Sequence, residues 1–382
     1  AYEATKEPFY LDVACKTATY IQREMTDENG GFYTAQDADS EGEEGRYYVF
    51  EPCEIVRVLG AEDGAYFNAY FNITEQGNFE GRNILNLIDN EKYAEKDARI
   101  EEAVEKLYAY RKQRYSLHRD EKVLTGLNAL MIAALAQLYR TTLEEEYLKG
   151  AVRAEKRIAK AIADSGQVCT YACGAGAATA GFLDDYAFYA YALLELYRAT
   201  FQADYLDRAL SVQQEIVQRF RDENGGYYMS AEDAERLIFR PMETFDNAMP
   251  SGNSVAAMNL VWLSLLTAQP EIIEEKEKHL TFMKSKAAAY AMGNGFFSYA
   301  LLKETYAGKQ LVCVLPEGAD IEELLSQTNN IFTVIVKFGE NKIAAAPFTD
   351  SHEMLEGKCT YYLCENYTCQ APTHNIEKLV RS

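Results

Sequence analysis

The sequence of 382 residues is poor in basic residues and has no long apolar run. Its 38 lysines and arginines are outnumbered by 59 aspartates and glutamates, which gives a formal net charge of −21 at pH 7. Such a charge repels phosphate groups and anionic lipid headgroups, so nucleic acid and membrane surfaces are not expected as partners. No apolar run approaches the roughly 20 residues of a membrane-spanning helix, and no basic segment followed by an apolar one opens the chain. We therefore expect a soluble, cytoplasmic protein.

Histidine is scarce, with single residues at 118, 279, 352 and 374. Only His118 neighbours a candidate site, so two histidines cannot be combined into a proton-shuttling mechanism. The sequence also contains no phosphate-binding glycine loop, no serine nucleophile elbow and no pair of metal ligands on one helix. We expect no cofactor and no bound metal ion.

Eight cysteines are scattered over a chain that is too long to need disulfides, and most of them are expected to be reduced core residues. Cys169 and Cys173 have the spacing of two zinc ligands, but no second close pair and no nearby histidine completes a zinc site. Cys364 and Cys369 have four residues between them, a looser spacing than that of redox motifs.

A long-range repeat is the strongest internal signal. Residues 2–33 align with residues 197–228 at a constant offset and without gaps, and a third copy follows Tyr139. Each copy predicts a helix, a short turn and a second helix, which stops at Asn-Gly-Gly because glycine readily adopts the left-handed conformation there. Such hairpins cannot bury their apolar faces alone and must stack on neighbours, and stacking that closes gives a ring.

Apolar periodicity predicts helices near 91–114, 122–140, 145–164, 180–199, 204–220, 253–268, 271–291 and 295–306. We therefore predict a mainly α fold, an (α/α)6-type toroid of helical hairpins, over residues 1–307. Residues 31–50 predict a β-hairpin insertion in which aromatic strands flank an acidic tip, and residues 308–382 predict a small α/β appendage. Because the chain opens on what looks like the end of a helix, we expect the toroid to be incomplete at its N-terminus and the chain to be a fragment.

The densest group of carboxylates, at 37–46, lies in the predicted hairpin loop. Carboxylates that face each other raise one another's proton affinity, which is how acid and base roles are separated in sugar hydrolysis. Asp37 and Asp39 are therefore candidate catalytic groups. The candidates for contact with a polar ligand are Tyr33, Glu41 and Tyr48. The alternatives are a solvated acidic loop and a weak calcium site without the EF-hand spacing.

Asp184 and Asp185 open the helix predicted at 180–199. A carboxylate in the first turn is stabilised by the helix dipole, so capping alone accounts for one of them. If this helix belongs to the inner layer, the other carboxylate projects towards the ring centre and can act on a ligand. We treat both as candidate catalytic groups and Tyr186 as a candidate ligand contact.

Two further junctions between loops and helices supply candidate ligand contacts. Residues 118–122 lead into the helix that contains Asn128, and charged junctions of this kind are usually structural. The loop 240–254 is long and polar, as loops that line sites often are, although its end at 253–254 also fits an ordinary helix cap. The candidates from these junctions are Arg119, Asp120, Asn128, Arg240 and Asp246.

Five motifs carry a resemblance to a known family. They are Gly-Gly-Phe-Tyr-Thr-Ala-Gln-Asp-Ala-Asp-Ser-Glu-Gly at 30–42, Glu-Gly-Arg-Asn-Ile-Leu at 80–85, Phe-Leu-Asp-Asp-Tyr-Ala-Phe at 182–188, Pro-Ser-Gly-Asn-Ser at 250–254 and Cys-Glu-Asn-Tyr-Thr-Cys-Gln-Ala-Pro at 364–372. Together they resemble the thioredoxin-domain proteins related to spermatogenesis-associated protein and its bacterial homologues. The resemblance covers almost the whole chain. It implies that a thioredoxin-like domain and the first helices of an (α/α)6 barrel precede Ala1 in the full-length protein.

The barrel of that family is similar to those of N-acylglucosamine 2-epimerases, cellobiose epimerases and several glycoside hydrolases, but a shared fold does not transmit an activity. Where the family tends to carry Trp-Asn-Gly, this chain has Leu127, Asn128 and Ala129, and the lost tryptophan weakens a platform for sugar stacking. Two hypotheses follow. The first is a protein that binds or processes a carbohydrate in an epimerase-like or glycosidase-like way. The second is a non-catalytic binding or scaffold module that serves a separate redox domain, with Cys364 and Cys369 in thiol exchange. Whether the chain is an enzyme stays open.

Overall fold

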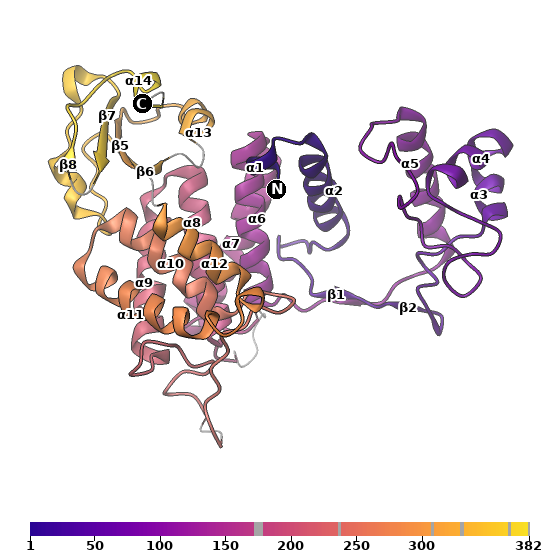
Figure 1. Cartoon of the computed structure of the whole chain (residues 1–382), viewed down its shortest axis with the longest axis horizontal. Helices are drawn as coiled ribbons and strands as arrows, with labels where there is room; N and C mark the ends of the chain where they lie inside the picture. The colour runs from indigo at the N-terminus through magenta and orange to yellow at the C-terminus, as the bar shows by residue number, and fades with distance from the viewer. Residues whose placement is uncertain (172–178, 236–237, 307–308, 329–331, 366–367, 381–382) are drawn as a thin grey trace.

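The computed structural model describes residues 1–171, 179–235, 238–306, 309–328, 332–365 and 368–380 (Figure 1). The α-helices are α1 Tyr2–Thr5, α2 Pro8–Glu24, α3 Pro52–Leu59, α4 Ala61–Tyr70, α5 Ala98–Arg114, α6 Thr125–Thr142, α7 Glu145–Ser165, α8 Leu183–Thr200, α9 Ala203–Phe220, α10 Gly252–Thr267, α11 Pro270–Ala287, α12 Gly295–Thr305, α13 Glu322–Thr328 and α14 Glu377–Val380. The strands are β1 Ala35–Gln36, β2 Asp39–Ser40, β3 Glu43–Glu44, β4 Arg119–Asp120, β5 Gln310–Leu315, β6 Thr333–Phe338, β7 Thr360–Glu365 and β8 Thr368–Cys369. The mainly α fold of helical hairpins with a small C-terminal α/β part is confirmed. None of the helices in the described ranges is both long and apolar enough to cross a membrane.

Four hairpin turns in the described residues have the same structure. The sequence alignment found three copies of the repeat, so the structure adds a fourth. A threonine hydroxyl donates to the carbonyl four residues earlier, at 2.8–3.0 Å, and accepts from the backbone N–H two residues later. These threonines are Thr5, Thr142, Thr200 and Thr267. The residue after each threonine has a positive φ of 52–59° that reverses the chain. These left-handed residues are Lys6, Leu143, Phe201 and Ala268.

The Asn-Gly-Gly turns of the first two copies are also equivalent in space. Gly30 and Gly225 both have a positive φ, of 89° and 95°, so the chain leaves each helix at a sharp angle. One buried asparagine then holds the next residue by both of its backbone groups. Asn128 binds the N–H and C=O of Phe32 at 2.7 and 2.9 Å, and Asn253 binds those of Tyr227 at 2.9 Å each. The aligned sequences therefore fold into the same structure.

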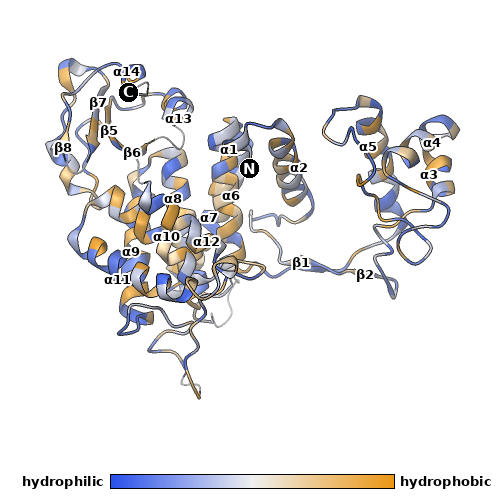
Figure 2. Ribbon diagram, in the orientation of Figure 1, coloured by the Kyte–Doolittle hydropathy of each residue, from blue (hydrophilic) through white to orange (hydrophobic). Residues whose placement is uncertain are grey.

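Helices α8 and α10 form the centre of the molecule. Almost every residue of both helices is buried, whereas α7, α9 and α11 bury only one face. Figure 2 shows apolar residues along the visible side of α10, and its buried residues lie on every side of the helix. A helix that is apolar on every side belongs to the interior, so α8 and α10 are inner helices and α7, α9 and α11 cover them.

Residues 50–115 form a small helical unit that the sequence did not predict as such. A separate hydrophobic cluster joins α3, α4 and α5, and its buried members are Phe50, Ile55, Phe67, Ile73, Ile100, Ala103 and Leu107. Figure 1 shows this unit standing apart from the bundle, to which the extended segments at β1 and β2 connect it. Strand β1 pairs with β4 on the return path, through Ala35 with Asp120 and Gln36 with Arg119.

The predicted β-hairpin is present but much shorter than expected. Strands β2 and β3 pair through Asp39 with Glu44 and Ser40 with Glu43, so the acidic residues themselves form the hairpin. The prediction that the aromatic residues form its strands is wrong. Phe32 and Phe50 make only isolated bridges, to Thr26 and Asn83.

The C-terminal unit is a four-stranded sheet of order β6-β5-β7-β8, in which β5 and β6 are parallel and β7 and β8 are antiparallel to their neighbours. Its apolar residues belong to the same hydrophobic core as those of the bundle. Hydrogen bonds reinforce this contact; among them, the Tyr197 hydroxyl accepts from the Val336 N–H at 3.4 Å, and Asp207 accepts from the Ala345 N–H at 2.7 Å. The predicted boundary at 307–308 lies outside the described residues.

Candidate functional site

Helices α6, α8 and α10 begin at the same end of the bundle, and the two adjacent aspartates of α8 join these starts. Asp185 accepts the N–H of Gly126, in the first turn of α6, at 3.1 Å, and Asp184 accepts the N–H of Gly252, the first residue of α10, at 2.9 Å. A side chain at position 252 would collide with the Asp184 carboxylate, so glycine permits this close approach. Negative charge is favoured at helix N-termini, which makes carboxylates suitable residues for this junction.

A third carboxylate joins the next pair of helices at this end. Asp246 accepts from the N–H of Ser251, the N-cap residue of α10, at 2.9 Å and from the N–H of Phe296, in the first turn of α12, at 2.7 Å. The Ser251 hydroxyl in turn accepts from the Ser254 N–H at 3.1 Å. The cap is thus Ser251 and not the predicted residues at 253–254.

Burial of these carboxylates changes their proton affinity. Burial raises the pKa of Asp185 to about 7, against hydrogen bonds from the N–H groups of Phe182 and Gly126 that lower it. Burial also raises the pKa of Asp184; the N–H of Gly252 lowers it, and the charge of Glu243 raises it further. Desolvation raises the pKa of Asp185 by more than the two hydrogen bonds lower it, so Asp185 gains or loses its proton near neutral pH.

Asp184 differs from Asp185 and Asp246 in having a carboxylate oxygen that remains available. Both oxygens of Asp185 and Asp246 accept backbone N–H groups, whereas only Oδ1 of Asp184 does so within the part of the chain that the structure describes. Asp184 is half-buried, Glu243 is exposed, and the charge of Glu243 acts on Asp184. Exposed aromatic rings lie nearby in sequence: Phe182 directly before α8 is 45% exposed, and Phe245 in the loop before α10 is 44% exposed. We call Asp184, Glu243, Phe182 and Phe245 the acidic end.

Three other predicted residues line a second feature, an open groove along the β1–β4 ribbon. They are Asp37, Arg119 and Asp120. Arg119 is held in place by Glu121 at 2.9 Å, by the carbonyl of Glu24 at 3.0 Å and by the ring of Tyr33, over which it stacks at 4.1 Å. Asp120 pairs with Lys122 at 2.9 Å. The ribbon leads directly into α6, but among the described contacts no hydrogen bond or ion pair joins Asp37 or Asp39 to Asp184 or Asp185.

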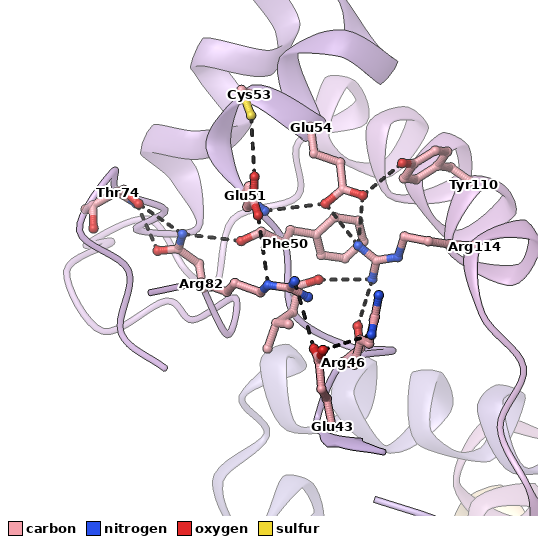
Figure 3. A network of polar contacts seen from close by, with 12 residues as sticks. Glu43, Arg46, Phe50, Glu51, Cys53, Glu54, Thr74, Arg82, Tyr110 and Arg114 are labelled. Carbon is pink, nitrogen blue, oxygen red and sulfur yellow. Dashed lines mark hydrogen bonds and ion pairs between the residues drawn. The ribbon is translucent and has the colours of Figure 1, made fainter. Parts of the chain in front are cut away.

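The backbone of the acidic loop is held by the helical unit beyond it, whereas the remaining predicted side chains, Asp39, Glu41 and Tyr48, are exposed. Figure 3 shows Arg114 in a polar network with Glu54, and Arg114 also donates to the carbonyls of Tyr47 and Val49 at 2.8 and 3.0 Å. Tyr48 donates to Gln36 at 3.1 Å, and burial raises its pKa to about 12. The other predicted residues here, Asp39 and Glu41, are exposed, and Glu41 lies 3.8 Å from Arg46.

Three predicted ligand contacts are instead structural residues. Tyr186 is fully buried and its hydroxyl bonds to Arg219, so its ring cannot stack on a ligand. The amide of Asn128 is occupied by the Phe32 backbone. The guanidinium of Arg240 donates to the carbonyls of Ser230 and Arg219 and lies over the ring of Tyr228. These side chains shape the loops at the helix starts and offer no group to a ligand.

The cysteines are mostly unpaired in the described ranges, where Cys15, Cys53, Cys169, Cys313 and Cys359 are free thiols. Cys169 is buried and lies 3.1 Å from the Ser165 hydroxyl. Cys173, which has the spacing of a second zinc ligand to Cys169, lies outside the described residues. Cys364 and Cys369 are joined by a disulfide.

The fold and the acidic end thus define a mainly α protein of stacked helical hairpins with carboxylates between its inner helices. Its sequence is 29% identical over 426 aligned residues to spermatogenesis-associated protein 20 of Homo sapiens, which confirms the resemblance to that protein. The thioredoxin-like domain that the resemblance implies stays a prediction. The alignment covers 97% of this chain and 54% of that protein, so the chain spans about half the length of its relative. No family model matches the sequence.

Solved structures with a related arrangement of helices are more distant. The cellobiose 2-epimerase of Spirochaeta thermophila DSM 6192 is 19% identical, with a TM-score of 0.36 over 43% of each chain. A GH76 α-mannanase of Bacteroides thetaiotaomicron is 14% identical, with a TM-score of 0.39 over 80% of each chain. Likenesses of this degree say nothing about the reaction of this chain.

Of the four residues of the acidic end, the sequence predicted only Asp184 as a site residue. Glu243 was missed for a physical reason. It lies in the loop 240–254 that was singled out, but its neighbour Asp184 is far away in the sequence. Their electrostatic interaction depends on the packing of α8 against α10, and no local sequence pattern predicts it.

Proposed function

We propose that the chain binds a neutral, sugar-like ligand at the acidic end. The observation that carries this proposal is the half-buried Asp184, with one carboxylate oxygen fixed on α10, the other without a hydrogen bond among the described residues, and the charge of Glu243 acting on it. A carboxylate whose position is already fixed loses little conformational freedom when it accepts a ligand hydroxyl. Phe182 and Phe245 add exposed rings on which the apolar face of a sugar can stack.

The charge of the molecule supports a neutral ligand over an anionic one. With a net charge of −21 and carboxylates at the acidic end, a phosphorylated or acidic sugar would be repelled. The hydroxyls of an uncharged sugar, in contrast, donate hydrogen bonds to carboxylate oxygens.

A finer proposal is that the site also processes the sugar, in an epimerase-like or glycosidase-like reaction. A carboxyl group with a raised pKa can donate a proton while a neighbouring carboxylate accepts one. In this reading Asp184 is the acid and Glu243 the base. The roles assigned to Asp37 and Asp39 stay predictions, with the ribbon groove as the surface where a longer ligand would meet them.

Titration calorimetry of the chain with neutral mono- and disaccharides tests the proposal. We expect saturable binding to at least one sugar, a loss of affinity of about tenfold or more in Asp184→Asn, and no change in Asp350→Asn, an exposed acid of the C-terminal unit. Chromatography of the incubated sugars then separates binding from turnover. If none of the sugars binds, or if Asp184→Asn and Asp350→Asn bind a sugar equally well, the proposal is wrong.

A second candidate is a non-catalytic binding module in a longer, cytoplasmic protein that carries a thioredoxin-like domain. The observation in its favour is the disulfide between Cys364 and Cys369, which marks the C-terminal unit as a place of thiol chemistry. Sugar binding without turnover, together with thiol exchange at that disulfide, is the result this candidate predicts.

A further inference from the structure

The disulfide crosslinks a short hairpin at the edge of the C-terminal sheet. Cys364 in β7 and Cys369 in β8 are directly opposite each other in the antiparallel register and only five positions apart in the sequence. Because a crosslink that closes so short a loop restricts the unfolded chain less than a long-range one, stability is a weak reason for it. The pair is also asymmetric, since Cys364 is 4% exposed whereas Cys369 is exposed. A reagent in solution therefore reaches Cys369 first.

A histidine from another part of the unit lies against this disulfide. His352 follows the short 3-10 helix Pro347–Ser351, and its Nε2 is 3.6 Å from the Cys369 sulfur. The ring is held edge-on against Tyr362, with centroids 4.7 Å apart, and Lys337 donates to the His352 carbonyl at 3.1 Å. The imidazole is therefore positioned by its surroundings, next to the sulfur that is open to attack.

We propose that Cys364, Cys369 and His352 form a thiol–disulfide exchange site that reacts with an external dithiol. A thiolate of the dithiol attacks the Cys369 sulfur, the bond between the two cysteine sulfurs breaks, and the electron pair leaves on Cys364. The second thiol of the reagent then attacks its own sulfur in the mixed disulfide and releases Cys369. Two electrons pass from the dithiol to the cysteine pair, and the reagent leaves as a disulfide.

His352 balances the protons of both steps. It accepts the proton of the attacking thiol and returns it to the departing thiolate, which is the role of a general acid and base. Burial lowers the pKa of His352, so the imidazole is neutral and able to accept a proton at neutral pH. A metal ion is the competing occupant, because the ligand atoms of these three residues lie within 4.8 Å of one another. The sulfurs of Cys364 and Cys369 are joined in a disulfide and are not thiolates, the form that binds a metal ion. The structure therefore favours thiol–disulfide exchange over metal binding.

This inference does not depend on the proposed sugar site and is tested separately on the full chain. The protein is equilibrated with mixtures of reduced and oxidised dithiothreitol, and alkylated cysteines are located by mass spectrometry. We expect Cys364 and Cys369 to gain two thiols together while the circular dichroism of the folded protein is unchanged. A pair that never bridges under oxidising conditions, or that is reduced only in denaturant, overturns the proposal.

The role of His352 is tested by the rate of reduction at pH 7. His352→Asn should slow the reaction by about tenfold or more, whereas His374→Asn should leave it unchanged, because His374 bonds to the Cys359 carbonyl and does not contact the disulfide. Equal rates for the two variants would contradict the assignment. If His352→Asn does not fold, the wild-type chain still decides: glutathione should form a mixed disulfide at Cys369, and its appearance at Cys364 alone would be contrary to the proposal.

Discussion

At the scale of single residues, the carboxylates between helix starts serve two purposes that must be separated. Asp185 and Asp246 use both oxygens to hold backbone N–H groups of neighbouring inner helices, so their function is to fix the geometry. Asp184 holds α10 with one oxygen and offers the other. Adjacent residues in the sequence thus differ in how many of their carboxylate oxygens accept backbone N–H groups, and the ligand-facing role proposed for Asp184 rests on its second oxygen.

The raised pKa of Asp185 predicts a pH-dependent stability. In the unfolded chain this group ionises near its usual pKa of 3.8, and in the folded chain near 7. Between these values the folded state keeps a proton that the unfolded state has lost, so the free energy of unfolding falls as the pH rises from about 4 to about 7. Wild type should lose on the order of a few kcal/mol over this range relative to Asp185→Asn, as measured by urea unfolding. A difference between the two proteins that is independent of pH would contradict the assignment.

The sequence identified the helix start at 182–188 but not which of its side chains are exposed. Tyr186 was predicted to contact it and is fully buried. This burial could have been inferred, because apolar residues lie on every side of α8 and such a helix has little exposed surface. The effect of the Glu243 charge on Asp184 could not have been inferred, because it depends on how the loop before α10 lies relative to α8.

At the scale of the elements, the hairpin turns depend on a threonine followed by a left-handed residue. None of the four left-handed residues is glycine, although a β-carbon disfavours this conformation. The helices from α5 to α12 were predicted from periodicity to within a few residues at most ends, and the aligned repeats fixed which helices pair. Helices α3 and α4 were missed because they are short, at 8 and 10 residues, and lie outside the repeat.

The turn before α11 gives a test with an internal control. Ala268 has a φ of 52°, so Ala268→Gly relieves backbone strain and should raise the free energy of unfolding by up to about 1 kcal/mol. Ala257 lies inside α10, where a change to glycine should lower the free energy of unfolding by about 1 kcal/mol or more. Urea titrations of the two variants give the comparison. Destabilisation by both to the same extent would show that the turn is not strained.

At the scale of the whole molecule, the bundle and the C-terminal unit share one core, whereas α3, α4 and α5 have their own. Periodicity could not predict this division, because a helix pattern shows which face is buried and not against which partner. The sequence therefore assigned α5 to the toroid. In the structure it packs on α3 and α4, and it meets α2 where Tyr108 bonds to Glu24.

Separate cores predict separate responses to cavity-forming substitutions. Ile55 in the small unit and Ile132 in the bundle are both fully buried. Each isoleucine-to-alanine change should cost about 2–5 kcal/mol within its own core. Ile55→Ala should speed amide hydrogen exchange in α3–α5 and leave α8 and α10 protected, and Ile132→Ala should do the reverse. Uniform loss of protection in either variant would mean that the cores unfold as one.

Hydrogen exchange also provides the most direct measurement of the central claim, that the acidic end is a sugar-binding surface. The chain is compared with and without a saturating neutral disaccharide selected by calorimetry. Amides at 182–186 and 243–254 should exchange more slowly with the sugar present, and this protection should disappear in Asp184→Asn. Protection confined to other segments, or none at either helix start, would contradict the account.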